Sequence, residues 1–456
     1  KVRLSYGTSG SDNINSNLWR ETWSSLSSSS NHTPINGELG SFYRPDGLLA
    51  NSDLKWETTI SRNLGLDFGF LNNRINGSLE IYWNTTKDLL MAVPVDNTTG
   101  YSYQFQNFGK TSNRGIELSL NFDVINKGDF RFNIGAIYNY NRNKLDELPN
   151  ADQYLYSSYW GSSSLVPTND YMFVEGKAIG LVRGFVSEGF YTVNDFRYEN
   201  GQYILKEGIP DITKALTATY MHPFNIPNGQ TAFPGAAKFR DVNNSGTVDL
   251  DDATCLGEVM PRHTGSFQLN FNYKNFDLSS NFNWTAGGKV YNVAAMINAS
   301  GQEFDGIGAQ RTSWVADTYK VYNVNSSGDL YAVTDPNELN ALNANAKYHL
   351  PYHQSGITSS EWLEDGSYLR LQTLTLGYTL PHTVLNKIHI EKLRIYLTAT
   401  NLFTITGYSG IDPEVNATPT GQSGFYSNLR VFPTLNMDFG TYPRARTFTL
   451  GGNITF

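Results

Sequence analysis

Apolar and polar residues alternate along much of this chain. Near its last residue, in "TFTLGGNITF", Phe448, Leu450, Ile454 and Phe456 fall on one side, and the threonines and Asn453 fall on the other. A period of two is typical of a β-strand, because successive side chains point to opposite faces. The same alternation starts at Val2, Leu64, Ile75, Ile116, Phe130, Phe267, Phe276, Leu374 and Leu393. The pattern therefore predicts about ten strands.

The connections between these segments are alternately long and short. The long ones are Thr8–Asp53, Pro94–Asn113, Asn143–Arg262, Thr285–Gly366 and Thr404–Thr441, and the short ones are Leu71–Asn73, Ile125–Asp129, Lys274–Asn275 and Pro381–Lys392. A soluble β-sandwich would explain the alternation of side chains, but it has no reason to sort its connections by length. Outer-membrane barrels have short periplasmic turns and long extracellular loops. The sequence therefore predicts an all-β, transmembrane antiparallel β-barrel with its apolar face toward lipid.

Composition agrees with this interpretation. Aromatic residues make up 14% of the 456 residues and charged residues only 17%, which is a bias toward β-structure. Aromatic residues at strand ends are those expected of a membrane-interface girdle: Trp83, Tyr138, Tyr140, Tyr273, Trp284 and Tyr378. The net charge of −8, with no cluster of lysine and arginine, argues against nucleic acid as a partner. A single cysteine, Cys255, excludes an internal disulfide framework.

The longest connection, residues 143–262, contains a segment that resembles a calcium loop. In "DVNNSGTVDLDD", residues 241–252, oxygen donors occupy the positions that an EF-hand-type loop uses, with Gly246 at the sharp turn. The predicted metal ligands are Asp241, Asn243, Ser245, Thr247, Asp249 and Asp252. A serine where a carboxylate is usual and an aspartate in place of the final glutamate both weaken the match. The alternatives are a structural Ca²⁺ site and a polar turn without metal.

Aromatic residues in the loops are the candidates for substrate contact. Tyr159 and Trp160 in "YLYSSYW", together with Trp314 and Tyr319, could stack on sugar rings or could pack the loops against one another. No arrangement of acid, base and nucleophile in the sequence is convincing for catalysis. The chain is therefore not expected to be an enzyme.

Six stretches together resemble the SusC/RagA family of TonB-dependent outer-membrane transporters. They are "LKWETTISRNLGLDFGFLNNRINGSLEIYWNTTKDLL", "NFGKTSNRGIEL", "KFRDVNNSGTVDLDDATCLG", "YLRLQTLTLGYTLP", "TATNLFTITGYSGIDPEV" and "YPRARTFTLGGNITF". They follow the order of the family and extend over essentially the whole chain, residues 1–456.

The resemblance implies that this chain is the C-terminal portion of a larger barrel. The predicted strands would be the last ten of about 22, a size associated with a plugged lumen, and the plug domain would be absent from this chain. The implied function is import of large nutrients, most often glycan oligosaccharides and in some members peptides, energised by TonB. The implied partners are a SusD-like surface lipoprotein at the extracellular mouth, and the TonB complex, which would contact a missing N-terminal region. The implied location is the bacterial outer membrane.

Three alternatives remain open at this stage. Ten strands could close a barrel by themselves, since even strand numbers from about eight upward occur. A TonB-dependent importer of iron chelates or cobalamin would share the same architecture. A surface β-protein with hydrolase activity would need a catalytic constellation that the sequence does not present. The strand at the first residues also leads us to expect a fragment or a processed product, and the pairing of residues 1–7 distinguishes a closed ten-stranded barrel from part of a larger one.

Overall fold

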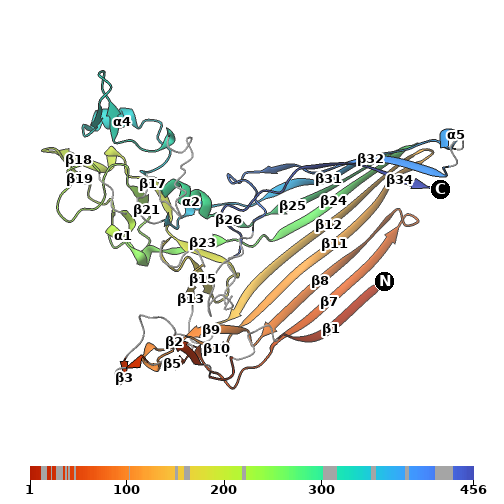
Figure 1. The fold of residues 1–456 in the computed structure, drawn as a ribbon, viewed down its shortest axis with the longest axis horizontal. Coiled ribbons are helices and arrows are strands. Elements are labelled where there is room, and N and C mark those ends of the chain that lie inside the picture. The colour runs from red at the N-terminus through yellow and green to blue at the C-terminus, as the bar shows by residue number, and fades with distance from the viewer. Residues whose placement is uncertain are drawn as a thin grey trace.

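A computed structural model of the chain describes residues 1–11, 18–21, 23–26, 34–35, 38–39, 42–45, 48–101, 103–148, 153–158, 165–217, 222–300, 316–350, 356–385, 390–415 and 435–456. Ten long strands form one antiparallel sheet: β1 (Val2–Ser11), β7 (Glu57–Phe70), β8 (Ile75–Lys87), β11 (Lys110–Lys127), β12 (Phe130–Glu147), β24 (His263–Tyr273), β25 (Phe276–Ala286), β31 (Tyr368–Thr379), β32 (Lys392–Thr406) and β34 (Thr447–Thr455). All ten predicted strands are present (Figure 1).

The ten strands pair in the order in which they follow one another along the chain. Within the described residues, β1 pairs only with β7 and β34 only with β32, so these two strands are the edges of the sheet. The sheet therefore does not close on itself, and the alternative of a self-contained ten-stranded barrel is wrong. An open edge in lipid would leave N–H and C=O groups without hydrogen bonds, so each edge requires a further strand. This arrangement is that of part of a larger barrel.

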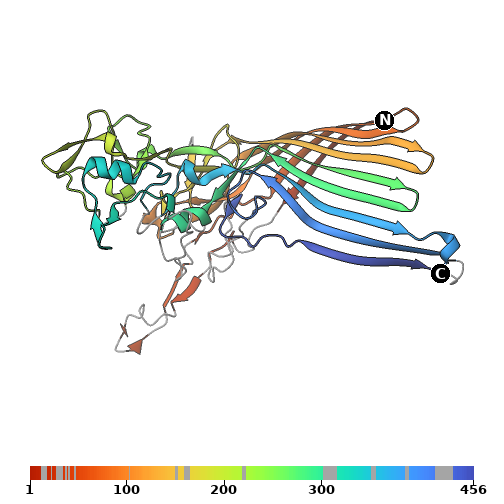
Figure 2. The same cartoon turned by 90° about the horizontal axis from the view of Figure 1, so that it is seen from above.

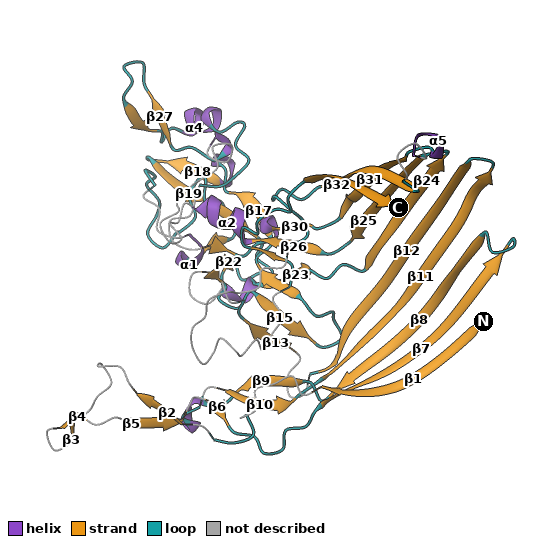
Figure 3. Ribbon diagram, turned by 45° about the vertical axis from the view of Figure 1, so that its right-hand side comes forward, coloured by secondary structure: helices purple, strands orange, loops and turns teal. Residues whose placement is uncertain are grey.

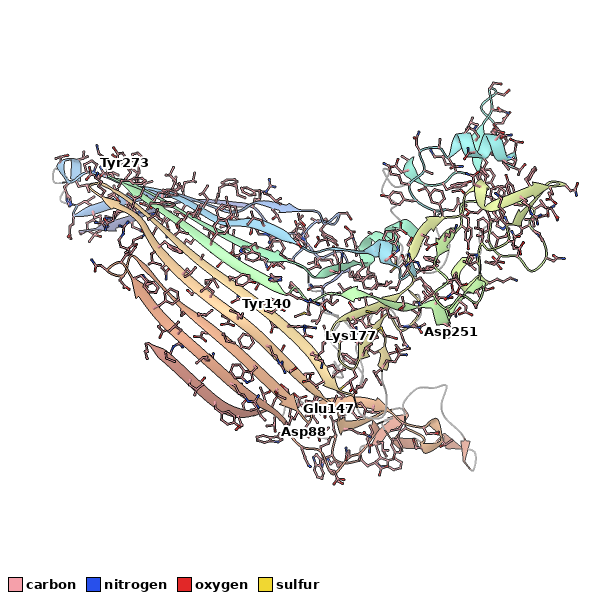
Figure 4. The ribbon with its side chains drawn as sticks, turned by 180° about the vertical axis from the view of Figure 1, so that it is seen from behind. Asp88, Tyr140, Glu147, Lys177, Asp251 and Tyr273 are labelled. Atoms are coloured by element: carbon pink, nitrogen blue, oxygen red, sulfur yellow. The ribbon has the colours of Figure 1, made fainter. Side chains whose placement is uncertain are left out.

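Short turns and long connections lie at opposite ends of the sheet. The turns after β7, β11 and β24 lie at the same end as both chain termini, and the long connections gather at the other end (Figures 1 and 2). Tyr273 marks the turn end and Glu147 the loop end (Figure 4). The sorting predicted from connection lengths is thus confirmed.

Several strands extend beyond their predicted ends. β12 continues to Glu147, past the predicted start of the loop at Asn143, because residues 143–147 pair with the beginning of β11. Both β11 and β12 have 18 residues, whereas about 9–11 are enough to cross the bilayer. The extra residues carry the sheet past the membrane, and polar residues there do not end a strand.

The outward face of the sheet is apolar and exposed. Its large apolar side chains include Val2, Leu4, Leu64, Leu66, Ile81, Ile116, Leu376, Leu397 and Leu450, with exposed fractions between 38% and 80%. An exposed apolar face of this extent is typical of contact with lipid. Outward aromatic residues gather in two groups, with Phe276 against Tyr378 at the turn end and Tyr138 against Trp284 toward the loops. The outward Arg62 donates to the Thr85 hydroxyl at 3.4 Å.

The long connections contain short strands and small helices (Figure 3). The strands are β2 (Trp23–Leu26), β3 (Pro34–Ile35), β4 (Glu38–Leu39), β5 (Phe42–Pro45), β6 (Leu48–Leu49), β9 (Leu90–Pro94), β10 (Tyr103–Asn107), β13 (Gln153–Tyr156), β14 (Leu165–Val166), β15 (Tyr171–Val174), β16 (Leu181–Gly184), β17 (Ser187–Phe190), β18 (Phe196–Glu199), β19 (Gln202–Leu205), β20 (Asp211–Ile212), β21 (Ala237–Phe239), β22 (Thr247–Val248), β23 (Thr254–Glu258), β26 (Lys289–Asn292), β27 (Tyr322–Val324), β28 (Leu330–Ala332), β29 (Gly356–Ile357), β30 (Leu363–Asp365) and β33 (Met437–Asp438). The helices are α1 (Lys214–Thr217), α2 (Val293–Ser300), α4 (Pro336–Leu342) and α5 (His382–Leu385), with 3₁₀ turns η2 (Asn97–Thr99), η3 (Val193–Asp195), η4 (Leu250–Asp252) and η5 (Ser360–Trp362). Among the helices of the described part of the chain, none combines the length and the apolar character that crossing a membrane requires.

Two long connections fold together into one unit, which consists of the described residues of 165–259 and 316–363. We call it the extracellular body, because the long loops of outer-membrane barrels are extracellular. Its buried core joins Phe185, Tyr191, Phe196, Tyr203 and Phe239 from the first connection to Tyr319, Val321, Val333, Leu339 and Ile357 from the second. The Tyr203 hydroxyl donates to the Thr334 carbonyl at 2.8 Å, and the Phe185 N–H donates to the Thr358 carbonyl at 2.9 Å. The body is therefore stabilised by its own apolar core.

Candidate functional site

The inward face of the sheet is polar, and its side chains bond across the strands. Near the N-terminal edge, the Arg3 guanidinium donates to both oxygens of Asp67, at 3.0 and 2.7 Å, and to Glu80 at 2.8 Å. The Asn63 amide donates to the other Glu80 oxygen at 2.8 Å. Three neighbouring strands are thus connected on the inward face by one charged network, as expected where polar side chains face a wet lumen.

A tyrosine crosses one strand on this face. The ring of Tyr82 on β8 lies over Gly115 of β11, where a Cβ atom would come within 2.4 Å of the Tyr82 hydroxyl oxygen. Its hydroxyl donates to the Asn141 side chain of β12 at 3.0 Å. This contact is possible because Gly115 has no side chain, which explains why a glycine stands inside this strand.

Farther along the sheet the inward face is largely uncharged. The Ser279 hydroxyl donates to the Asn270 side chain at 2.8 Å, and the hydroxyls of Thr375 and Thr398 lie 3.0 Å apart. At the turn end, Arg394 donates to both oxygens of Asp277, at 2.9 and 2.5 Å. This part of the wall thus presents amide and hydroxyl groups, with a closed ion pair at the turn end.

At the loop end, Arg370 of β31 binds a loop that follows β32. Its guanidinium contacts Asp412 at 2.5 Å and Glu414 at 3.2 Å, and its Nε donates to Thr404 at 3.1 Å. Glu414 also pairs with Arg444 at 2.7 Å. These contacts join "YLRLQTLTLGYTLP" to "GYSGIDPEV". The sequence did not single out Arg370, because a register shift between Leu371 and Thr373 interrupts the alternation and nothing local identified its partners.

The calcium-like segment is a compact turn of the extracellular body. The Asp252 carboxylate is fully buried: its Oδ1 accepts from the Val242 and Asn243 N–H groups at 2.7 and 3.2 Å, and its Oδ2 accepts from the Asp249 N–H at 2.9 Å. Asp249 accepts from the Asp251 N–H at 2.8 Å and begins η4. Asp252 is therefore committed to holding the two ends of the segment together.

The other predicted ligands are also bonded within the segment. The two Asp241 oxygens accept from the N–H groups of Ser245 and Gly246, at 3.1 and 2.7 Å, and the Asn243 side chain accepts from Ser245 at 2.8 Å. The Ser245 hydroxyl donates to the Thr247 carbonyl at 2.8 Å. In the part of the chain that the structure describes, no three His, Cys, Asp or Glu side chains are arranged as a metal site. The segment fits a hydrogen-bonded polar turn, and calcium there stays a prediction.

The aromatic residues proposed for substrate contact have different outcomes. Tyr159, Trp160 and Trp314 lie outside the described residues. Tyr319 is 3% exposed and packs edge-on against Phe190 in the core of the extracellular body. For Tyr319 the structure favours the packing alternative, because its ring joins the two connections.

Three groups of the loop region have altered acidity. Asp170 is fully buried and accepts from the Ser158 N–H at 2.6 Å and from its hydroxyl at 2.5 Å. Burial raises the pKa of the Asp170 carboxyl to about 6. Glu361 lies 3.8 Å from His349, and burial raises the pKa of Glu361 to about 7 and lowers that of His349 to about 4. Burial thus brings the pKa values of these two carboxyls close to neutral pH.

The known proteins that resemble this chain have the architecture described above. The family described as "TonB dependent receptor-like, beta-barrel" matches residues 1–402. TonB-dependent receptor P3 of Formosa agariphila is 29% identical over the whole chain, and TonB-dependent receptor SusC of Bacteroides thetaiotaomicron is 26% identical over the whole chain. The chain spans 39% and 37% of these two relatives.

A solved structure gives the same fold. The RagAB peptide transporter matches with a TM-score of 0.66 and 21% identity, over all of this chain and 40% of that one. The partial coverage agrees with an open sheet whose two edge strands have no further neighbour among the described residues. The resemblance to SusC and RagA is confirmed, and the chain belongs to the TonB-dependent receptor family as the C-terminal part of an outer-membrane β-barrel.

Proposed function

We propose that the complete protein imports oligosaccharides across the outer membrane as the SusC-type component of a SusCD-like complex, energised by TonB. The observation that carries this proposal is the division of one sheet into an apolar outward face and a polar inward face. On β24, β25 and β31 this inward face presents mainly amide and hydroxyl groups, and a folded body lies at the extracellular end. Hydroxyl-rich substrates exchange hydrogen bonds readily with such an inward face.

The extracellular body supplies the surface for a partner. A SusD-like surface lipoprotein would contact the body and enclose the mouth, so that substrate is captured before transport. Contact with TonB would come from a part of the protein outside this chain. The proposed role is binding and gating, without catalysis.

A structural calcium ion at residues 241–252 is a separate proposal. Its donors would be Asp241, Asn243, Ser245, the Thr247 carbonyl and Asp249. Asp252 could join them only by giving up backbone hydrogen bonds. The ion would stabilise one turn of the extracellular body and has no part in the transport step.

The proposal is tested by uptake in cells that lack the native gene and carry the complete transporter on a plasmid. We expect labelled neutral oligosaccharides to enter only when both the transporter and TonB are present. Ferric chelates, cobalamin and peptides serve as competing substrates in the same cells. TonB-dependent uptake restricted to one of these competitors would refute oligosaccharide import.

A further inference from the structure

The inward face of the sheet contains a charged region and a neutral region, and β12 lies between them. The first, which we call the charged wall, consists of the inward side chains of β1, β7, β8 and β11. It contains Arg3, Glu57, Asp67, Glu80, Glu117 and Asp123, which are one positive and five negative groups. Arg3 neutralises part of this charge through Asp67 and Glu80. The charged wall therefore keeps an excess of carboxylates.

The second region, the neutral wall, consists of the inward side chains of β24, β25 and β31 between two ion pairs. Its side chains are amides and hydroxyls, among them Ser266, Gln268, Asn270, Ser279, Asn281 and Thr375. On these three strands the described inward residues carry charge only at the ends. Asp277 pairs with Arg394 at the turn end, and Arg370 is held by Asp412 and Glu414 at the loop end.

The two walls suit different contacts. Fixed carboxylates bind cationic groups of a protein surface and hold them in register, which favours a lasting contact. Uncharged hydrogen-bond donors and acceptors that repeat along the strands offer a substrate many weak binding sites. A series of weak sites allows the substrate to pass from one to the next. A charged substrate on the neutral wall would lose hydration without finding a counter-charge.

A barrel of about 22 strands, the size that the family resemblance implies, has a lumen that is partly filled by protein. A substrate must then pass on one side of that protein. We propose that the neutral wall borders the path of an uncharged, hydroxyl-rich substrate, and that the charged wall contacts the protein that fills the lumen. This inference rests on the proposed import function, and it adds which strands line the path.

The experiment uses the complete transporter with Cys255→Ser, so that no native cysteine of this chain reacts. Asn281→Cys places a thiol on the neutral wall, and Ser119→Cys places a matched thiol on the charged wall beside Glu117. Intact cells with and without TonB are treated with a neutral, a sulfonated and a cationic maleimide of similar size. Oligosaccharide uptake by each variant is measured in parallel.

We expect Asn281→Cys to react several-fold faster with the neutral maleimide when TonB is present, and more slowly with both charged reagents. Ser119→Cys should stay unreactive in both cell types. Faster TonB-dependent labelling of Ser119→Cys, or labelling of neither thiol in cells that still import, would overturn the inference while leaving the import function standing. If the unsubstituted transporter shows no TonB-dependent uptake of oligosaccharides, the proposed import function itself is refuted.

Discussion

Arg370 and Asp412 form an ion pair of 2.5 Å although their side chains are only 3% and 9% exposed. Arg370 is on a barrel strand and Asp412 is in a loop 42 residues later. A buried charge is tolerated only when it is paired and hydrogen-bonded. The pair therefore fixes the loop after β32 to the wall at the extracellular end of the barrel.

Removing one partner of this pair should be costly. Asp412→Ala leaves the Arg370 guanidinium buried with only Glu414 as a counter-charge, and breaking such a pair typically costs about 3–5 kcal/mol. We expect a lower temperature of heat-induced unfolding in detergent and faster proteolysis of the loop. Arg444→Ala, which removes only the exposed contact with Glu414, is the control and should change stability little. Equal effects of the two substitutions would show that burial of the pair is unimportant.

Membrane topology can be checked with single cysteines in a Cys255→Ser background. Glu207 lies on the exposed surface of the extracellular body, and Asp129 lies in the short turn between β11 and β12. Each is replaced by cysteine in a separate variant. A membrane-impermeant maleimide should label Glu207→Cys in intact cells and Asp129→Cys only after the outer membrane is permeabilised. The reverse labelling would invert the assignment of the two ends.

The calcium proposal and the polar-turn alternative differ in what calcium does. Asp241→Ala with Asp249→Ala should remove any stabilisation by calcium, measured as the difference in unfolding temperature between calcium and chelator. Asp252→Ala should destabilise the extracellular body with or without calcium, because three backbone N–H groups lose their acceptor. An unsubstituted transporter that unfolds identically in calcium and in chelator would rule out the metal and leave the polar turn.

Stability of the loop region should fall as pH rises through the range set by Asp170. Its pKa is about 6 in the folded protein against 3.8 as the ordinary value, so between these values the folded state binds more protons than the unfolded state. The free energy of unfolding therefore decreases from about pH 4 to about pH 6, by an amount on the order of 3 kcal/mol.

Asp170→Asn keeps the shape of the side chain and removes the ionisation. The variant should lose this part of the pH dependence and be relatively more stable at neutral pH, as measured by protease resistance across the same pH range. Ser157→Ala, at a neighbouring and exposed hydroxyl, is a suitable control. An unchanged pH profile in Asp170→Asn would assign the pH dependence to other groups, such as Glu361.

The sequence by itself determined the barrel strands, their lipid-facing side and the end at which each connection lies. Hydrophobic period two is a local property, and a membrane strand must obey it along its whole length, so residues such as Leu64, Leu66 and Phe68 reveal their face without any tertiary information. The exact ends of the strands could not be predicted in the same way, because β12 continues above the membrane, where apolar alternation is no longer required.

Only the tertiary structure decided how the long connections fold. The core that joins Tyr203 to the region of Thr334, the pair of Arg370 with Asp412, and the use of Tyr319 as a core residue all connect parts of the chain far apart in sequence. In an extracellular loop a tyrosine, an aspartate or an arginine has the same local pattern whether it binds a ligand or another loop. The difference arises from which distant partner removes it from water, and that depends on the folded arrangement as a whole.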